Sequence, residues 1–145
     1  ADHAVIRALD AAEIAAAAHR AGAAFREDPG FSHLIPDDAA RRHRLPSLLE
    51  AILRVDAASG GRVLGAFDDG ALVGMSSVLP AGTRNPALGV WLRHARGLSW
   101  LLADPAALLR TLALGSAVER LRLESYRISA LLREKPHGAS QRLAL

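Results

Sequence analysis

Apolar and polar positions follow the clearest strand pattern on either side of residues 68–70. The run from Gly61 to Phe67 and the run from Ala71 to Leu79 are rich in residues that suit a pleated surface. Between them lies Asp68-Asp69-Gly70, in which the glycine can adopt the positive φ of a tight hairpin turn. The pattern predicts a β-hairpin. Because a hairpin alone is marginally stable, we expect further elements to pack on it.

A short strand and a helix are predicted before the hairpin. Ala4 to Leu9 mixes apolar and polar residues as a strand does, and Asp10 then suits a helix N-cap. Glu13 stands three residues later, where its carboxylate can reach back to the cap amide. The apolar face of this helix contains Ile14, Ala17, Ala21 and Phe25. Its small alanines predict close approach to another element, and Glu27-Asp28-Pro29-Gly30 ends the helix.

A second helix is predicted before the hairpin, after an apolar connector. Residues 31–36 are too few for a regular element, and Asp37 or Asp38 can cap the helix that follows. Pro46 lies inside that helix and predicts a restart or a kink near Leu45. The apolar face of the helix comprises Leu45, Leu48, Leu49, Ile52 and Leu53. Gly60-Gly61 provides a glycine cap at its end.

Two further helices are predicted after the hairpin. Apolar residues repeat at helical spacing from Leu88 to Leu102. Within this third helix, Trp91 and Trp100 would lie on opposite sides, because they are separated by about two and a half turns. Asp104-Pro105 is a strong start signal for a fourth helix, which we expect to extend to Glu134.

The composition favours one globular domain over residues 1–145, and the predicted elements give it a mostly helical α+β fold. Of the residues, 50% are hydrophobic and 23% are charged. Cysteine is absent, which excludes disulfides and thiolate metal sites. Lys135 is the sole lysine among 18 basic residues, which indicates the codon bias of a GC-rich bacterial genome. We therefore do not take the net charge of +3 as evidence for a nucleic-acid partner.

The chain carries no recognisable targeting or membrane-spanning pattern. Asp2 and Asp10 occupy the N-terminal region, and no apolar run follows a basic start as in a signal peptide. The most apolar region, Leu88 to Leu114, is interrupted by charged residues too often to cross a bilayer. We expect a cytoplasmic protein with no membrane partner.

Few residues indicate chemistry on their own. The sequence contains no phosphate-binding glycine loop, no Gly-x-Ser-x-Gly and no His-Glu-x-x-His. Its six histidines match no metal-ligand spacing, so we expect no metal. The cluster Arg41-Arg42-His43-Arg44 could bind phosphate. Four consecutive positions spread around a helix, however, and a solvated face is the favoured interpretation.

The order strand, helix, helix, hairpin resembles the N-terminal half of the GNAT N-acetyltransferases. Residues 23–42, with their Ala-Phe, Asp-Pro and Leu-Ile-Pro-Asp, look like the segment that joins the first two helices in a bacterial branch of that superfamily. The hairpin and its closing Leu79-Pro-Ala-Gly82 look like the second and third strands of the same branch. The Arg- and Leu-rich residues from Leu88 onward resemble its insertion before the fourth strand.

The resemblance implies transfer of an acetyl group from acetyl-CoA to a small-molecule or peptide amine. In that family the cofactor pyrophosphate binds backbone amides in a Gln/Arg-x-x-Gly-x-Gly/Ala loop after the fourth strand. Lys135-Pro136-His137 looks like the lead-in to this strand, and the loop itself does not occur in the chain. The resemblance therefore implies a truncated GNAT fold of the α/β sandwich type, without cofactor-binding or identifiable catalytic residues, and we expect it to be inactive as given. The alternative is a cofactor-free remnant that acts as a protein-interaction module.

The resemblance also suggests an amine-side pocket. Its lining would come from the connector region and the facing hairpin residues: Phe25, Phe31, Leu34, Ile35, Met75 and Ser77. Ordinary core packing is the alternative for these side chains and is favoured for Phe25. The strand Ala71 to Leu79 would lack a neighbour on its outer side, and we expect homo-oligomers to form through this edge. A helical DNA-binding regulator is a poorer hypothesis, since it leaves the hairpin unexplained.

Overall fold

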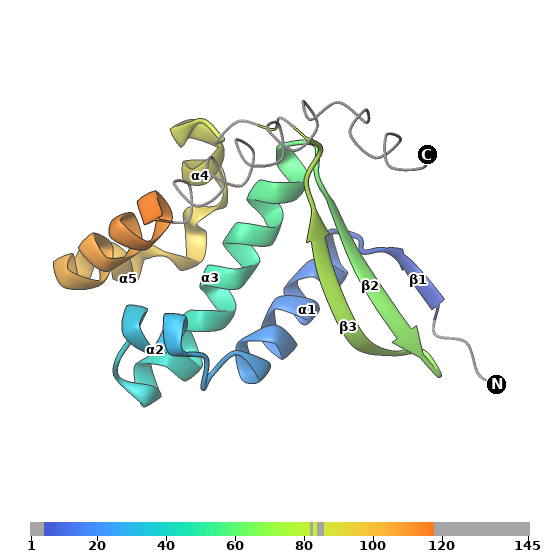
Figure 1. The fold of residues 1–145 in the computed structure, drawn as a ribbon, viewed down its shortest axis with the longest axis horizontal. Helices are drawn as coiled ribbons and strands as arrows, with labels where there is room; N and C mark the ends of the chain where they lie inside the picture. Colours follow the sequence, from blue (N-terminus) through green and yellow to red (C-terminus); the bar gives the residue numbers. More distant parts are fainter. Residues whose placement is uncertain (1–4, 82, 84–85, 118–145) are drawn as a thin grey trace, which may run out of the picture. The chain divides into compact units, whose positions relative to one another are not determined.

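The computed structural model describes residues 5–81, 83 and 86–117 and has a mixed α+β fold that is mostly helical (Figure 1). Its elements are β1 (Val5–Ala8), α1 (Ala11–Ala24), α2 (Pro29–Leu34), α3 (Asp38–Ala58), β2 (Arg62–Asp68), β3 (Ala71–Val78), α4 (Leu88–His94), the 3-10 helix η1 (Ala95–Gly97) and α5 (Ser99–Ala103). Residues 105–117 are also helical. The predicted mostly helical α+β class is confirmed for the described residues.

The chain divides into two compact units, residues 1–107 and 108–145. All the strands and the labelled helices belong to the first unit. At the end of that unit, the Ala107 amide donates to Asp104 Oδ1 over 2.9 Å, which confirms the predicted helix start at Asp104-Pro105. The predicted extension of this helix to Glu134 lies outside the described residues.

The three strands form one antiparallel sheet in the order β1-β2-β3. Asp69 and Gly70 have φ angles of 46° and 76° at the turn between β2 and β3, as a two-residue hairpin of the primed type requires. The register shifts between Ala66 and Phe67, whose partners are Gly74 and Leu72, so Val73 is the extra residue of a β-bulge in β3. The predicted hairpin and its pairing with the N-terminal strand are confirmed, and β3 lies at an edge of the sheet.

Helix α1 begins as the sequence predicts. The Asp10 carboxylate accepts hydrogen bonds from the amides of Ala12 and Glu13, and Glu13 Oε2 accepts the Asp10 amide over 2.9 Å. This reciprocal capping box satisfies amides that the first helical turn otherwise leaves unpaired. The predicted face is buried at Ile14, Ala17 and Ala21, but Phe25 at the helix end is 44% exposed, so its assignment to that face was wrong.

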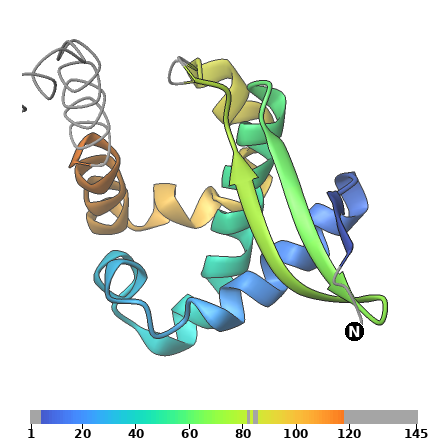
Figure 2. The ribbon, with the colours of Figure 1, turned by 45° about the vertical axis from the view of Figure 1, so that its right-hand side comes forward.

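Helices α1 and α3 pack closely and form the core beside the sheet (Figure 2). A methyl group on Gly22 would lie 2.8 Å from Pro46 Cγ, so the two helices approach more closely here than a larger residue would allow. Helix α3 continues through Pro46 without the restart that was considered, and the proline ring lies in the helix interface. The helix ends as predicted, at Gly60 with a φ of 86°.

The connector is a short helix, and the prediction of an irregular segment there was wrong. Asp28 caps α2 by accepting the Gly30 amide over 2.9 Å and the Phe31 amide over 3.2 Å. Pro29 occupies the first helical position. An amide at this position forms no hydrogen bond within the helix, so proline, which lacks the amide hydrogen, is tolerated there. Asp28 and Pro29, which were interpreted only as part of the end of the first helix, therefore also begin α2.

The single third helix predicted from Leu88 to Leu102 is also wrong, because the structure divides this segment into α4, η1 and α5. The division lies where η1 meets α3: a methyl group on Gly97 would stand 2.7 Å from Ser47 Cβ. Trp91 and Trp100 consequently belong to different helices, and both are partly buried. Leu98 and Leu101, which follow η1, are buried.

Candidate arginine-lined site

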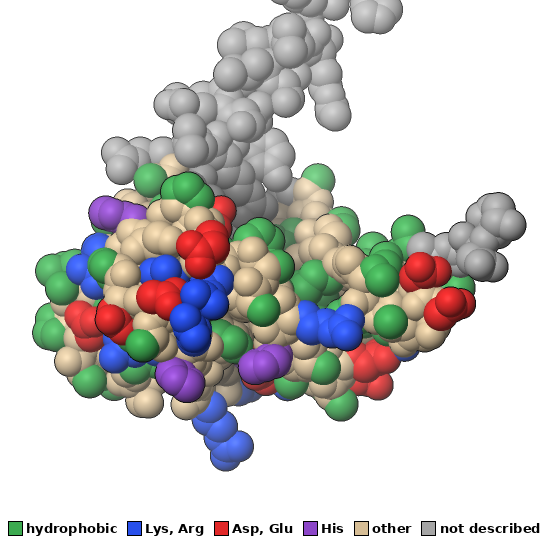
Figure 3. Space-filling model, turned by 90° about the horizontal axis from the view of Figure 1, so that it is seen from below, with side chains coloured by type: hydrophobic (Ala, Val, Ile, Leu, Met, Phe, Trp, Pro, Cys, Tyr) green, Lys and Arg blue, Asp and Glu red, His purple; other side chains and the backbone are tan. Residues whose placement is uncertain are grey.

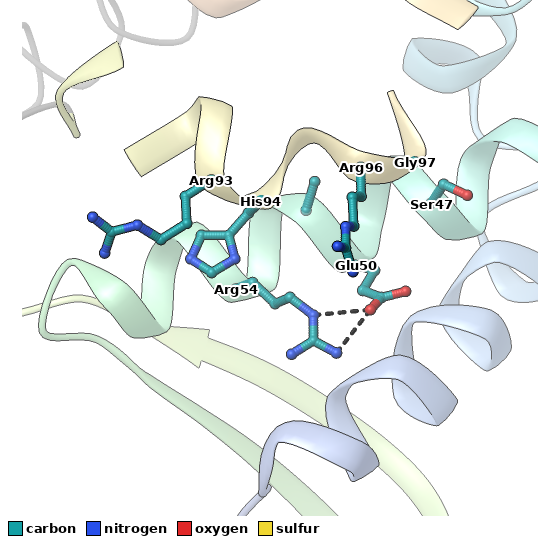
Figure 4. A pocket seen from close by; sticks show the side chains of 8 residues that line it. Ser47, Glu50, Arg54, Arg93, His94, Arg96 and Gly97 are labelled. Atoms are coloured by element: carbon teal, nitrogen blue, oxygen red, sulfur yellow. Dashed lines mark hydrogen bonds and ion pairs between the residues drawn. The ribbon is translucent and has the colours of Figure 1, made fainter. Parts of the chain in front are cut away.

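A hollow of about 330 Å³ lies between α3 and the segment formed by α4 and η1 (Figure 4). We call it the arginine groove. Its lining residues are Ser47, Glu50, Ala51, Arg54, Arg93, His94, Arg96 and Gly97. The four residues from α3 follow the pattern i, i+3, i+4 and i+7, which places them on one face of that helix. The other four residues are nearly consecutive and cross over this face.

Specific contacts hold the two walls of the arginine groove together. Gly97 lets η1 lie directly against Ser47. Beyond it, the Arg44 guanidinium lies 5.1 Å from the centroid of the Trp100 ring and within 3.5 Å of an Asp104 carboxylate oxygen. These contacts join α3 to both ends of α5. The groove therefore lies between elements that are fixed relative to each other by packing.

Arginine charge exceeds carboxylate charge in the groove. Arg54 Nε donates to Glu50 Oε1 over 2.8 Å, so the one carboxylate already has a cationic partner. Arg54 also donates from Nη2 to the Ala11 carbonyl over 3.0 Å, which fixes its guanidinium in place.

Within the described ranges, neither Arg93 nor Arg96 forms an ion pair. Figure 4 shows His94 and Arg96 directed toward the Glu50-Arg54 pair, whereas Arg93 points away from it. The arrangement suits an anion with several oxygen atoms.

A second charged cluster lies near the start of α3. The prediction of a solvated face holds for Arg42 and His43, which are exposed, but is wrong for Arg41. Arg41 is buried, and it donates to the carbonyls of Arg26 over 2.7 Å and Ile35 over 2.6 Å. It also pairs with Asp38, which binds Arg26 and Arg42 as well. The hydrogen bonds from Arg26 and then Arg42 hold the pKa of Asp38 below its ordinary value. Arg41 is thus a structural residue, because it joins the start of α3 to the backbone on both sides of α2.

Oppositely charged side chains are intermingled on the helical part of the face drawn in Figure 3. The ion pairs of Asp38 have the same mixed character, since one carboxylate meets three guanidinium groups. This face consequently presents no uniform basic surface of the kind that tracks a nucleic-acid backbone.

The four predicted pocket residues near α2 lie close together. The rings of Phe25 and Phe31 are 5.9 Å apart between centroids and tilted by 54°. Leu34 and Ile35 are each 2% exposed and belong to the core. Core packing therefore accounts for Leu34 and Ile35, while Phe25 and Phe31 form a partly exposed aromatic pair.

The two predicted pocket residues of the hairpin lie elsewhere. Met75 and Ser77 are on β3, and Ser77 Oγ donates to Asp56 Oδ2 over 2.6 Å near the end of α3. Ile35 instead contacts Arg41, near the start of α3. Arg41 and Asp56 are separated by roughly 22 Å along a regular helix. The structure does not bring the two sets of predicted residues into one pocket.

The outer edge of β3 has no strand partner among the described residues. No residue from Ala71 to Val78 is charged, and the side chains of Val73 and Val78 are 62% and 51% exposed. One backbone acceptor on this strand is occupied, because Arg20 donates to the Leu72 carbonyl. The remaining edge carries the features of a strand that can pair with another chain.

The arginine groove was not predicted from the sequence. Ser47, Glu50 and Arg54 follow a helical spacing, but such spacing is common in exposed helices. The residues that cross over them belong to α4 and η1, beyond the hairpin, so no local spacing links the two walls of the groove.

Two kinds of site are not found in the part of the chain that the structure describes. No group of three or more histidine, aspartate or glutamate side chains is placed to hold a metal ion there. No helix in the same residues combines the length and apolar character needed to cross a bilayer.

The chain matches no protein-family model, no curated protein and no solved structure.

Proposed function

We propose that this chain provides the amine-side part of a GNAT-type N-acetyltransferase, an enzyme that transfers acetyl from acetyl-CoA to a small-molecule or peptide amine in the cytoplasm. The observation that supports the proposal is the antiparallel order β1-β2-β3 with the helices α1 to α3 between the first two strands. This is the arrangement that the sequence resemblance implies for the N-terminal half of that fold.

The described residues do not fit the pyrophosphate of acetyl-CoA. Such an anion is bound by free amides at a helix N-terminus. Helices α1, α2, α3 and the helical segment 105–117 each begin at an aspartate that accepts these amides: Asp10, Asp28, Asp37 and Asp104. The carboxylates occupy the donors and repel a second anion. The segment before α4, residues 80–87, contains a single glycine and no Gly-x-Gly. We therefore assign no step of the transfer to this chain alone.

Calorimetry with acetyl-CoA tests the cofactor part of this proposal. We expect no heat of binding at roughly 1 mM ligand, which corresponds to a binding free energy weaker than about 4 kcal/mol. A dissociation constant in the micromolar range would contradict the absence of a cofactor site. The nucleotide sequence that follows the codon of Leu145, read in all three frames, tests the family: a Gly-x-Gly loop after a strand supports it, and its absence contradicts it.

The uncharged edge of β3 favours a second function, that of an interaction module. The partner that we propose is a second copy of the chain, whose β3 would pair with the first in antiparallel register around a two-fold axis. An edge without charges is compatible with itself, since no like charges face each other across such a pair. Light scattering after size-exclusion chromatography at several concentrations tests this function. A monomer at every concentration would rule it out.

A further inference from the structure

We propose that the arginine groove binds the phosphate group of a small phosphorylated molecule. The proposal does not depend on the acetyltransferase assignment, because it rests on charges and contacts in a different part of the fold. The site differs from a helix N-terminus, since its donors are side chains of α3, α4 and η1 that face one another.

The charges of the groove match a phosphate dianion. Arg54, Arg93 and Arg96 supply three positive charges, and Glu50 supplies one negative charge that Arg54 already balances. A phosphate monoester carries a charge of about −1.5 to −2 near neutral pH. The unpaired arginine charge directed into the groove comes from Arg96, and Arg93 adds to the positive field from the rim, so a phosphate dianion gains more from the two than a monocarboxylate does.

The fold holds cationic groups near one another in the absence of a ligand. The hydrogen bond from Arg54 to the Ala11 carbonyl fixes one wall. On the other wall, Gly97 packs against Ser47, and the neighbouring Arg96 is directed toward the Glu50-Arg54 pair. Like charges held in this way repel each other, and a bound anion would relieve the repulsion while accepting hydrogen bonds from both walls.

The size of the groove indicates more than a free phosphate ion. A volume of about 330 Å³ lies at the lower end of the range for pockets that bind small organic ligands. Ser47 and Ala51 contribute small side chains to the α3 wall, so the volume is not filled from that side by long side chains other than Glu50 and Arg54. Arg93, which points away from the centre, extends the positive field toward solvent and would attract the ligand.

Titration calorimetry of the full chain with inorganic phosphate and with phenyl phosphate tests the proposal. We expect both to bind, phenyl phosphate more tightly, and Arg96→Gln to weaken both by about tenfold, as loss of one charged hydrogen bond predicts. The matched control is Arg62→Gln, which removes the same charge from an exposed position at the start of β2 and should leave the affinity within about twofold.

Three results would overturn the proposal. The first is the absence of phosphate binding at roughly 10 mM. The second is an equal loss of affinity in Arg96→Gln and Arg62→Gln, which would assign the binding to the net charge of the chain. The third is citrate binding more tightly than phenyl phosphate, which would assign the groove to carboxylates. Circular dichroism of each variant should match the parent chain, because both arginines are exposed.

Discussion

At the scale of single residues, close approach between backbones depends on glycine at a few positions. Gly22 lies against the rigid ring and backbone nitrogen of Pro46, and Gly97 lies against Ser47. In each case a helical segment approaches α3 over a residue without a side chain. These contacts set the spacing of the α1–α3 core and of the arginine groove.

The contact between Gly22 and Pro46 predicts a stability loss in Gly22→Ala. The added methyl group would lie 2.8 Å from Pro46 Cγ and 3.2 Å from Pro46 N, and neither atom can move without displacing α3. Overpacking outweighs the gain in helix propensity, and we expect a net loss of about 1 to 2 kcal/mol in the free energy of unfolding. Urea denaturation measures this change.

Gly115→Ala is the matched control, because Gly115 is also helical and has open space around its Cα. We expect this variant to be neutral or stabilised by up to about 1 kcal/mol. Equal destabilisation of the two variants would contradict the role assigned to Gly22.

The ion pair between Arg7 and Glu13 predicts a specific sensitivity to acid. The hydrogen bonds from Arg7 and then from the Asp10 amide lower the pKa of Glu13 from 4.5 to about 2. A carboxyl group with a lowered folded-state pKa stabilises the fold above its unfolded value and loses that effect as the pH falls. We therefore expect stability to decrease as pH falls from about 4.5 toward about 2.

Glu13→Gln should flatten that part of the pH dependence, measured as the urea midpoint at each pH. Glu27→Gln serves as the control, because the Glu27 side chain is 81% exposed and its ion pair with Arg26 is long, at 3.5 Å. A pH profile in Glu13→Gln identical to that of the parent chain would show that this ion pair does not govern the acid response.

At the scale of elements, local signals in the sequence predicted the parts of the fold that short-range interactions determine. The capping box of Asp10 and Glu13, the turn at Asp69-Gly70 and the glycine cap at Gly60 all depend on neighbours within a few residues. Long-range packing decided the rest. Gly97 breaks the third predicted helix because Ser47, 50 positions earlier, lies beneath it.

The same distinction explains what the sequence could not predict about candidate sites. Arg41 looked like part of an exposed basic run, but its buried contacts include the carbonyl of Arg26, 15 residues away. The arginine groove likewise joins α3 to a segment that follows the hairpin. Neither arrangement is encoded in a local spacing.

The cap of α2 allows a direct test at this scale. Asp28→Ala removes the acceptor of the Gly30 and Phe31 amides, and we expect a loss of about 1 kcal/mol in the free energy of unfolding. Asp28→Ser retains a capping oxygen and should recover most of the loss. If serine and alanine at this position have the same stability, the cap is not the source of the effect.

At the scale of the whole molecule, the helices and the free sheet edge have different surface chemistry. Charged pairs cover the helical part of the face in Figure 3, while β3 offers uncharged residues along an open edge. The edge of β3 lacks the charged side chains that protect an edge strand from pairing. Leucines are also exposed on the helices, at Leu88, Leu92, Leu102, Leu109 and Leu112. The edge of β3 is thus one uncharged surface through which two copies can associate.

Val73→Lys tests this preference, because a lysine at an exposed position on an edge strand opposes pairing with another strand. We expect the mass from light scattering to remain that of a monomer at concentrations where the parent chain associates. Val73→Thr is the control, since threonine also suits a strand and carries no charge. Association of the lysine variant at the parent's concentration would assign the contact to another surface.

Arg54 gives the groove a connection to the opposite side of the core. Its guanidinium contacts Glu50 in the groove and, at the same time, the Ala11 carbonyl in the first turn of α1. A phosphate that draws this guanidinium toward itself would lengthen the bond to Ala11. Amide hydrogen exchange in the first turn of α1 would then report occupancy of the groove, although no residue of that turn touches the ligand.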